Sequence, residues 1–490
     1  MGKVGITGEP VQIPDRLGGG TTSFTLSGDP STGSGWVDGI EWTPGDRNMN
    51  MSSGPFNMMP GDTQEVVYAQ MAFGADDGVD RLGAVQLLKF YSKYVQMIYN
   101  GMGIVELPET SPVINSYSAD REIILYWGSS IENVDKIENH NSFFSFQGYN
   151  IYQVPNEDSE ISDGIKIAAY DLKDGIDTIY DEEFDLSSQR IVTITKHEGR
   201  DTGIDRYIKL DVDYLRDQPF NNGTNYYFIV EPYYYNPDGL LSPRTIETHS
   251  EVIKVMPHSA DPGIRFEFEF GDKIPVHSAS GNVSDVVDVM VIDPSQLTGH
   301  DYEITFHEST KQLLWNLEDV TSGEIKLSDQ TNITGTDEYY IVDGFMIIIT
   351  QDTSNQQTSN QLTSDDVFTF TTPGVIDDEE LAKFDVEKIN VFPNPYYGGH
   401  SNELSQYQNY VMFNHLPKRA TFRIFNLAGH LVRTLHKDDG TQFYLWDLQN
   451  ENRLLAPSGL YIIYIEMPDL QKVKVLKLAI VQRQVVPSNF

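Results

Sequence analysis

The chain has 490 residues with 34 Lys and Arg against 72 Asp and Glu, and its net charge of −38 argues against a nucleic acid or an anionic membrane as partner. Because it contains no cysteine, disulfides, thiolate zinc sites and cysteine nucleophiles are excluded. Its length predicts about three or four structural units, and no apolar run approaches the ~18 residues that a transmembrane helix needs.

Residues 1–108 contain the one long helix that the sequence predicts, from a cap at Asp80 to a stop at Asn100. Residues 64–73 read as a strand that supports this helix. A unit with one helix and few strands is typical of the end of a domain, and the polar N-terminus has no apolar secretory segment. We therefore expect the chain to be a fragment of a longer precursor.

Residues 109–257 are predicted to form a β-sandwich. The expected strands are 122–127, which ends in Trp127, then 146–152 and 222–230. This pattern resembles the fibronectin type III family, which implies a sandwich of antiparallel strands. The distance between the second and third of these strands departs from that pattern and predicts an insertion around residues 155–215.

The predicted insertion is rich in acidic side chains, and carboxylate oxygens are the ligands that calcium prefers. The candidate calcium ligands are Asp171, Asp174, Asp177 and Asp181. Their spacing does not match an EF-hand loop, so a solvated acidic loop is the favoured interpretation. No other cofactor is expected.

A run of tyrosines follows in residues 232–237. In a strand, Tyr233 and Tyr235 share one face, so we expect both in the core, whereas the orientation of Tyr234 stays open. Exposed tyrosines here could stack on a glycan.

Residues 258–372 are predicted to form a second all-β unit. Residues 265–270 alternate strictly between charged and aromatic side chains, as a half-buried strand does. Further strands are expected at 286–292, 302–306, 313–317, 345–350 and 367–370, with an exposed polar loop at 352–363. Residues 373–389 are acidic and read as a linker to the last unit.

Residues 390–490 are predicted to form a compact sandwich of about seven short strands. Two prolines in the run 393–395 mark its entrance, and turns at 427–430 and 456–459 separate apolar strands. This unit has ten Lys and Arg against seven Asp and Glu, a net charge of +3, which leaves −41 for residues 1–389.

The last unit resembles the C-terminal sorting domain of proteins exported by the bacterial type IX secretion system. The resemblance rests on an ordered set of short motifs: Pro-Asn-Pro at 393–395, a pattern of strand, Asn-Leu-x-Gly and strand at 422–432, Trp-Asp at 446–447, Gly-x-Tyr at 459–461 and a lysine-rich final strand. The residues that the resemblance assigns to the export signal are Pro393, Asn394, Pro395, Gly459, Tyr461, Lys474 and Lys477. Thirteen residues follow Lys477, more than is usual in the family.

No catalytic signature is present. The sequence lacks a phosphate-binding loop, a His-Glu-x-x-His helix, a Gly-x-Ser-x-Gly elbow and a dinucleotide fingerprint. The nearest approaches, at His197 and His307, lack the second histidine and read as strand-edge or loop residues. We therefore expect the chain not to be an enzyme.

The sequence thus predicts a mainly β chain of immunoglobulin- or fibronectin III-like sandwiches with one helix-containing N-terminal segment. The type IX resemblance implies a secreted or surface-attached protein of a Gram-negative bacterium whose partner is the export machinery of the outer membrane. Two alternatives stay open: accessory modules of a secreted hydrolase whose catalytic domain lies upstream, and an adhesive or filament-forming protein that associates with itself or with a surface glycan.

Overall fold

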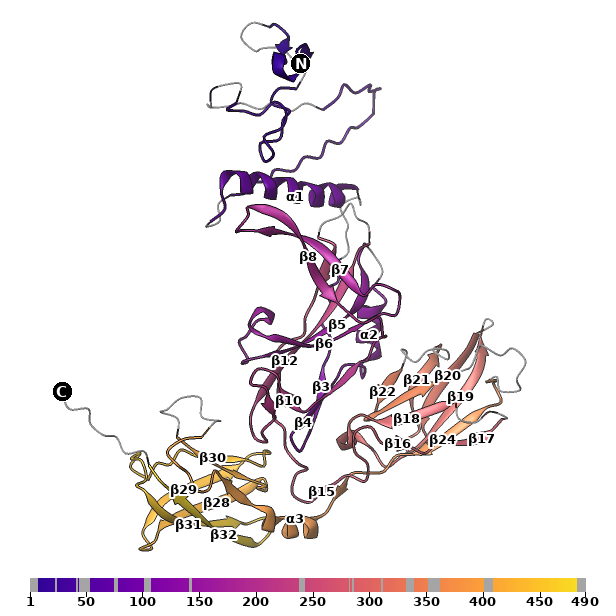
Figure 1. Cartoon of the computed structure of the whole chain (residues 1–490). Coiled ribbons are helices and arrows are strands. Elements are labelled where there is room, and N and C mark those ends of the chain that lie inside the picture. Colours follow the sequence, from indigo (N-terminus) through magenta and orange to yellow (C-terminus); the bar gives the residue numbers. More distant parts are fainter. Residues whose placement is uncertain are drawn as a thin grey trace, which may run out of the picture.

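The structure, a computed structural model, describes residues 8–22, 24–40, 43, 53–74, 78–100, 107–140, 143–237, 243–281, 283, 286–309, 312–331, 339–350, 362–400 and 409–482. It confirms the predicted fold class, since most regular elements are strands paired into small antiparallel sheets. Three β-rich bodies follow the N-terminal segment along the chain (Figure 1). The predicted loop at 352–363 lies almost wholly outside the described residues.

The N-terminal segment contains the predicted helix. Its described elements are β1 (Val11–Gln12), η1 (Asp15–Leu17), β2 (Thr21–Thr22) and α1 (Arg81–Asn100). Asp80 caps α1 as expected, because its Oδ1 accepts the Gly83 amide at 2.7 Å. The predicted strand at 64–73 is wrong: this stretch has no neighbouring strand to pair with and forms none.

Helix α1 instead rests on a hairpin of the first sandwich, formed by β7 (Thr178–Asp185) and β8 (Arg190–Glu198) (Figure 1). Gln189 at the hairpin turn accepts the Asp80 amide at 2.8 Å and donates to the Gly78 carbonyl at 2.8 Å. A Cβ on Gly83 would lie 2.1 Å from Oε1 of Gln189, so a larger residue there would displace the Gln189 side chain from these bonds.

The first sandwich packs two main sheets face to face, with strand orders β3-β4-β9 and β13-β12-β5-β6, and β14 also pairs with β12. Part of the predicted insertion, β6 and β9, thus belongs to these sheets, whereas β7 and β8 form the projecting hairpin. The other bounds are β3 (Asn115–Ala119), β4 (Glu122–Tyr126), α2 (Ile131–Glu138), β5 (Ser145–Val154), η2 (Ile161–Asp163), β6 (Ile165–Asp171), β9 (Tyr207–Leu210), β10 (Val212–Asp213), β11 (Gln218–Pro219), β12 (Tyr226–Tyr235), β13 (Thr245–Glu247) and β14 (Ile253–Val255).

The second sandwich has sheets of order β16-β18-β23-β22 and β17-β24-β19-β20-β21. The predicted strand at 265–270 is largely wrong, because β15 (Ile264–Arg265) ends after two residues and the chain then bends. The other bounds are β16 (Lys273–Ile274), β17 (His277–Ser280), β18 (Val287–Val291), η3 (Pro294–Gln296), β19 (Asp301–Ser309), β20 (Gln312–Asp319), β21 (Glu324–Gln330), β22 (Tyr340–Val342), β23 (Phe345–Ile349), β24 (Val367–Thr371) and β25 (Ile376–Asp377).

The first two sandwiches share a buried interface. One apolar cluster combines Ile124 and Tyr126 of the first with Ile292, Ile341 and Met346 of the second. The Tyr126 hydroxyl donates to Asp293 at 2.9 Å, and burial together with that carboxylate raises the pKa of Tyr126. The two bodies are therefore joined by a shared core rather than by a flexible linker.

The segment predicted as a linker, 373–389, is ordered. It contains β25, α3 (Glu379–Asp385) and η4 (Val386–Lys388). Strand β25 pairs with β15, so the two ends of the second sandwich meet. Asp385 is 2% exposed and accepts from Arg265 at 2.7 Å and from the Gly263 amide at 2.9 Å, which ties the linker to the start of the second sandwich.

The terminal sandwich packs a sheet of order β26-β27-β30 against one of order β29-β28-β31-β32. Its bounds are β26 (Asn390–Phe392), β27 (Val411–Asn414), β28 (Arg419–Asn426), β29 (Leu431–Asp438), β30 (Tyr444–Trp446), β31 (Gly459–Met467) and β32 (Lys472–Ile480). Its core is self-contained, since all members of that cluster lie between Ala382 and Ile480.

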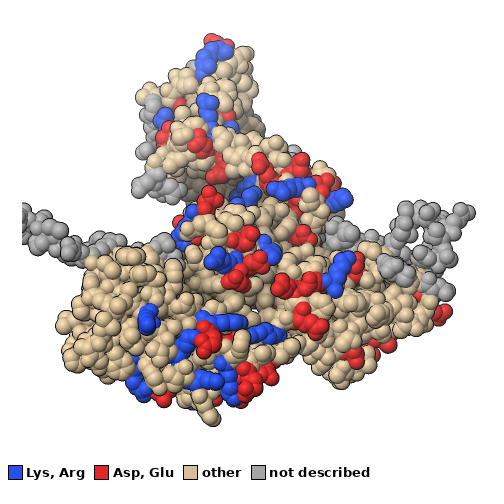
Figure 2. Space-filling view, turned by 60° about the horizontal axis from the view of Figure 1, so that its bottom comes forward, with Lys and Arg blue, Asp and Glu red and all other residues tan. Residues whose placement is uncertain are grey.

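Charged side chains of both signs are interspersed over the face in Figure 2, whereas the terminal sandwich, at the left, shows a broad area without them. Among the described residues, no helix combines the length and apolarity needed to span a bilayer.

Candidate functional site

The terminal sandwich brings several of the predicted export-signal residues together. Asn394 lies between the two prolines, and its side chain reaches the last strand: Nδ2 donates to the Lys477 carbonyl at 2.7 Å, and Oδ1 accepts the Ala479 amide at 3.2 Å. Next to it, the Tyr396 amide donates to the Ala479 carbonyl at 2.8 Å. The Pro-Asn-Pro segment therefore covers the edge of β32 and satisfies backbone groups that an edge strand leaves open.

Lys474 fastens the linker to the same strand. Its Nζ donates to the Glu387 carbonyl at 3.1 Å and to Oε2 of Glu387 at 2.5 Å. The hydrogen bond from Lys474 lowers the pKa of the Glu387 carboxyl. Lys477 differs, because it lies opposite Ile462 on the outer face of the sheet and is exposed.

The two fixed residues of the Gly-x-Tyr motif lie in different surroundings: Tyr461 is in the core, and Gly459 has free space around it. Tyr461 is 3% exposed, its ring lies 6.0 Å from that of Trp446, and its hydroxyl donates to the Pro457 carbonyl at 2.7 Å. Burial raises the pKa of Tyr461. At Gly459 a Cβ would meet nothing within 4 Å, so the packing gives no reason for glycine there.

The candidate calcium ligands do not converge. Among the described residues, no group of three or more histidine and acidic side chains is placed to hold a metal ion. Asp171 accepts from the amides of Arg200 and Asp201 at 2.8 and 2.9 Å, and Asp174 accepts from Gln147 at 2.9 Å.

The other two candidates play unrelated parts. Asp181 lies on the hairpin and accepts the Arg244 amide at 3.0 Å, whereas Asp177 is exposed and uses its backbone carbonyl to accept the Gly199 amide at 2.8 Å. The four acids therefore bind separate groups and mostly order their own loops, and calcium binding stays a prediction.

His197, expected at a strand edge or in a loop, is 4% exposed and belongs to a buried polar cluster. Its Nε2 lies 2.9 Å from Glu247 and its Nδ1 lies 3.1 Å from Nδ2 of Asn150, which also donates to Glu231 at 3.0 Å. Burial raises the pKa of Glu231; for Glu247 the same effect is outweighed by the bond from His197, and its pKa is lowered. This cluster joins the hairpin to the main sheet, a contact that residue spacing did not reveal.

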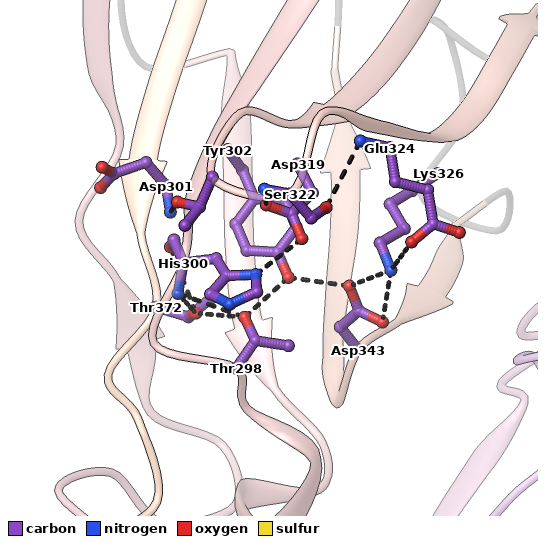
Figure 3. A network of polar contacts seen from close by, with 11 residues as sticks. Thr298, His300, Asp301, Tyr302, Asp319, Ser322, Glu324, Lys326, Asp343 and Thr372 are labelled. Carbon is purple, nitrogen blue, oxygen red and sulfur yellow. Dashed lines mark hydrogen bonds and ion pairs between the residues drawn. The ribbon is translucent and has the colours of Figure 1, made fainter.

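A second polar cluster closes one end of the second sandwich (Figure 3). Nδ1 of His300 lies 2.7 Å from Asp319, and the Tyr302 hydroxyl donates to Asp343 at 2.7 Å and lies 2.9 Å from Thr298. Burial raises the pKa of Asp319, but bonds from His300 and the Ser322 amide outweigh it and lower that pKa to about 2.

The groups of this cluster bind one another across the ends of β19, β20 and β24, so they hold the loops at these strand ends together. His307, the other histidine singled out in the sequence, pairs with Asp329 at 2.9 Å on the outer face of the same sheet.

No protein-family model matches the chain, and no curated protein matches it. Among solved structures, it is similar to PorZ, a surface component of the type IX secretion system of Porphyromonas gingivalis, with 12% identity over 75% of this chain and 43% of that one and a TM-score of 0.18. Dimeric latent PorU of Porphyromonas gingivalis matches with 12% identity over 77% and 33% and a TM-score of 0.15.

The adhesin domain of Epf from Streptococcus pyogenes matches with 9% identity over 76% of this chain and 99% of that one, with a TM-score of 0.15. The chain spans less than half the length of PorZ and of PorU. These low identities and TM-scores assign neither a family nor a function to the chain, whose mainly β fold rests on its own paired strands.

Proposed function

We propose that the chain is a non-catalytic region of a protein that is secreted or attached to the surface of a Gram-negative bacterium, and that its terminal sandwich is a type IX export and attachment signal. One observation carries the proposal: motifs 83 residues apart in the sequence meet in one sandwich, where Asn394 of the first motif binds the backbone of the last strand at Lys477. The partner is the export machinery at the outer membrane.

The polar clusters of the upstream sandwiches support a non-catalytic role. In the cluster around His300, the imidazole, the Tyr302 hydroxyl and the Asp343 carboxylate each bind a neighbouring side chain. Catalytic sites instead pair a nucleophile with a base and leave room for a substrate. These clusters hold loops together.

A reporter fusion tests the export role. The fused segment must begin at Asp378, because Ala382, Val386 and Ile389 belong to the core of the terminal sandwich. Placed behind a signal peptide and a fluorescent protein, residues 378–490 are expected to bring the reporter to the surface or medium of a host with a type IX system. In a matched strain without the outer-membrane exporter, the reporter is expected to stay in the periplasm.

The reciprocal deletion removes residues 378–490 from the chain. The upstream sandwiches have cores of their own, so we expect them to fold and to accumulate in the periplasm. Normal secretion of this shortened chain, or periplasmic retention of the fusion in the competent host, would refute the export assignment.

A further inference from the structure

The larger sheet of the terminal sandwich turns apolar side chains toward solvent. Strands β31 and β32 alternate, so every second residue faces outward, and Leu460, Val473 and Val475 are 50%, 45% and 53% exposed. The strand register places Val475 opposite Tyr464 and Leu431 opposite Phe425. We name this surface the terminal apolar face; its residues are Phe425, Leu431, Leu460, Tyr464, Val473 and Val475.

The second sandwich provides a comparison within the same chain. The outer face of its larger sheet pairs Glu303 with Glu318 and with Thr369, and pairs Thr305 with Asn316, and its exposed Ile325 lies opposite Glu318. An open sheet normally has such a polar solvent-facing side. The terminal apolar face is therefore a property of the last sandwich, and exposed apolar patches of this kind mark interaction sites.

Both edges of the terminal sheet are partly covered. Asn394 and Tyr396 bind the backbone of β32, as described above. At the opposite edge, Glu451 accepts the Thr434 amide at 2.7 Å and donates its own amide to the Val432 carbonyl at 3.0 Å. A partner that added a strand would need these groups free, so the sheet is built for docking on its face.

The opposite side of the sandwich already has a contact within the chain. Met412, on the outer face of β27, lies so close to Gly223 of the first sandwich that a Cβ there would be 2.6 Å from its Cε. Met412 thus contacts the first sandwich. Its cross-strand neighbours Phe392 and Leu445 are 52% and 53% exposed, about as much as Val475 of the terminal apolar face.

Charge indicates the chemistry of the partner. Lys477 is exposed on the same face as the apolar residues, and Arg423 lies there opposite Tyr464, on a unit of net charge +3 in a chain of net charge −38. Glu466, bound to Arg423 at 2.8 Å, lies on the same face, and it opposes an anionic bilayer, as does the charge of the whole chain. Cations around an apolar centre fit a protein surface with carboxylates at its rim.

We propose, resting on the export function above, that the terminal apolar face is the docking surface for a partner protein of the export route, one that presents an apolar patch rimmed by carboxylates. The terminal apolar face exists only when β28, β29, β31 and β32 are paired in one sheet, so the partner recognises the domain after it has folded.

The test uses the full chain behind a signal peptide in a host with a type IX system. Leu460→Glu and Val475→Glu each place a carboxylate on the face, and Val475→Ser removes the apolar contact without adding charge. Leu445, 53% exposed on the smaller sheet, supplies the matched control Leu445→Glu. Circular dichroism and thermal unfolding of each purified variant show that it is folded.

We expect the two glutamate variants to lower the secreted amount by about tenfold or more, since an unpaired carboxylate is costly to bury in an apolar interface. Val475→Ser is expected to lower it less, while Leu445→Glu is secreted as the unchanged chain is. If the unchanged chain is itself retained, the export function fails and the inference falls with it. If the unchanged chain and the folded face variants are secreted equally, the inference alone is overturned.

Two further results would also overturn it. Light scattering that shows a dimer of the unchanged chain, lost in Val475→Glu without any effect on secretion, would assign the face to a second copy. Binding to phosphatidylglycerol vesicles, lost in the same variant without any effect on secretion, would assign it to a lipid surface.

Discussion

The side chain of Asn394 binds the two peptide groups on either side of Leu478 in the last strand, donating to the carbonyl of Lys477 and accepting the amide of Ala479. A residue at the entrance of the sandwich thus holds its final strand, 83 positions away along the sequence. The Pro-Asn-Pro motif therefore has a structural purpose whether or not an exporter reads it.

Replacing Asn394 by Ala removes both hydrogen bonds and leaves two backbone groups of β32 to water. We expect a loss of about 1–2 kcal/mol in the stability of the terminal sandwich, at ~1 kcal/mol for each bond. Hydrogen exchange of the β32 amides measures this loss directly. Asn452→Ala, at an exposed turn, is the matched control and should leave exchange unchanged; equal protection of β32 in both variants would contradict the assigned role.

A substitution at Gly459 tests recognition by the exporter separately from the stability of the fold. Because a Cβ at this position meets nothing within 4 Å, Gly459→Ala should change stability by less than about 0.5 kcal/mol. If the exporter reads the Gly-x-Tyr motif, the same variant secretes less reporter at unchanged thermal stability. Secretion at the normal level would remove Gly459 from the recognised residues, and a large loss of stability would show that the glycine is structural.

Asp385 joins the second and terminal sandwiches. Although burial raises its pKa, hydrogen bonds from Arg265, the Gly263 amide and Lys388 outweigh that effect and hold the pKa of Asp385 well below its usual range. Asp385→Asn should weaken the joint by about 2 kcal/mol, since hydrogen bonds to charged groups contribute ~1.5–3 kcal/mol. Limited proteolysis at residues 373–389 is then expected to speed up, whereas Glu380→Gln, at an exposed position of the same helix, should not change it.

The His300 and Asp319 pair predicts an acid-sensitive second sandwich. The pKa of Asp319 is lowered to about 2 from an ordinary value of 3.8, so its stabilising contribution is present above the ordinary value and is lost as the pH falls from about 4 to about 2. Asp319→Asn should lower stability at neutral pH and flatten the pH dependence in this range. Urea unfolding followed between pH 6 and pH 2.5 tests this, and parallel curves for the two proteins would contradict it.

Local alternation predicted the terminal strands well, because each of these strands has one buried face and a neighbour on at least one side. Residues 265–270 alternate equally well and yet form no strand beyond Arg265. Two of their aromatic side chains pack on the first sandwich instead, with Phe266 at 6.1 Å from Tyr117 and Phe270 at 5.8 Å from Tyr207 between ring centroids, while Phe268 packs on the core of the second. Periodicity shows which side chains are buried; it does not show whether a neighbouring strand exists.

The tyrosine run shows a second limit. Tyr233 and Tyr235 were expected in the core and Tyr234 was left open, but Tyr233 and Tyr234 are 1% and 0% exposed, and Tyr235 is half-buried. The two side chains point to opposite faces of β12, and both faces are covered: Tyr234 packs in the core of the first sandwich, whereas Tyr233 stacks on His197 of the projecting hairpin at 4.2 Å between ring centroids. The contacts of Asn394, Asp385 and His197 likewise join distant segments, so no local pattern could have predicted them.

Because β15 pairs with β25, the chain enters and leaves the second sandwich at two neighbouring strands. If the chain is pulled from both ends, the load passes across this short ribbon and the Arg265 to Asp385 ion pair before it reaches the sandwich itself. Once β15 and β25 separate, the roughly 110 residues between them could unfold and extend to about 370 Å, at ~3.4 Å for each residue. In a surface protein built in this way, tension on the chain would open the second sandwich before it unfolds the last domain.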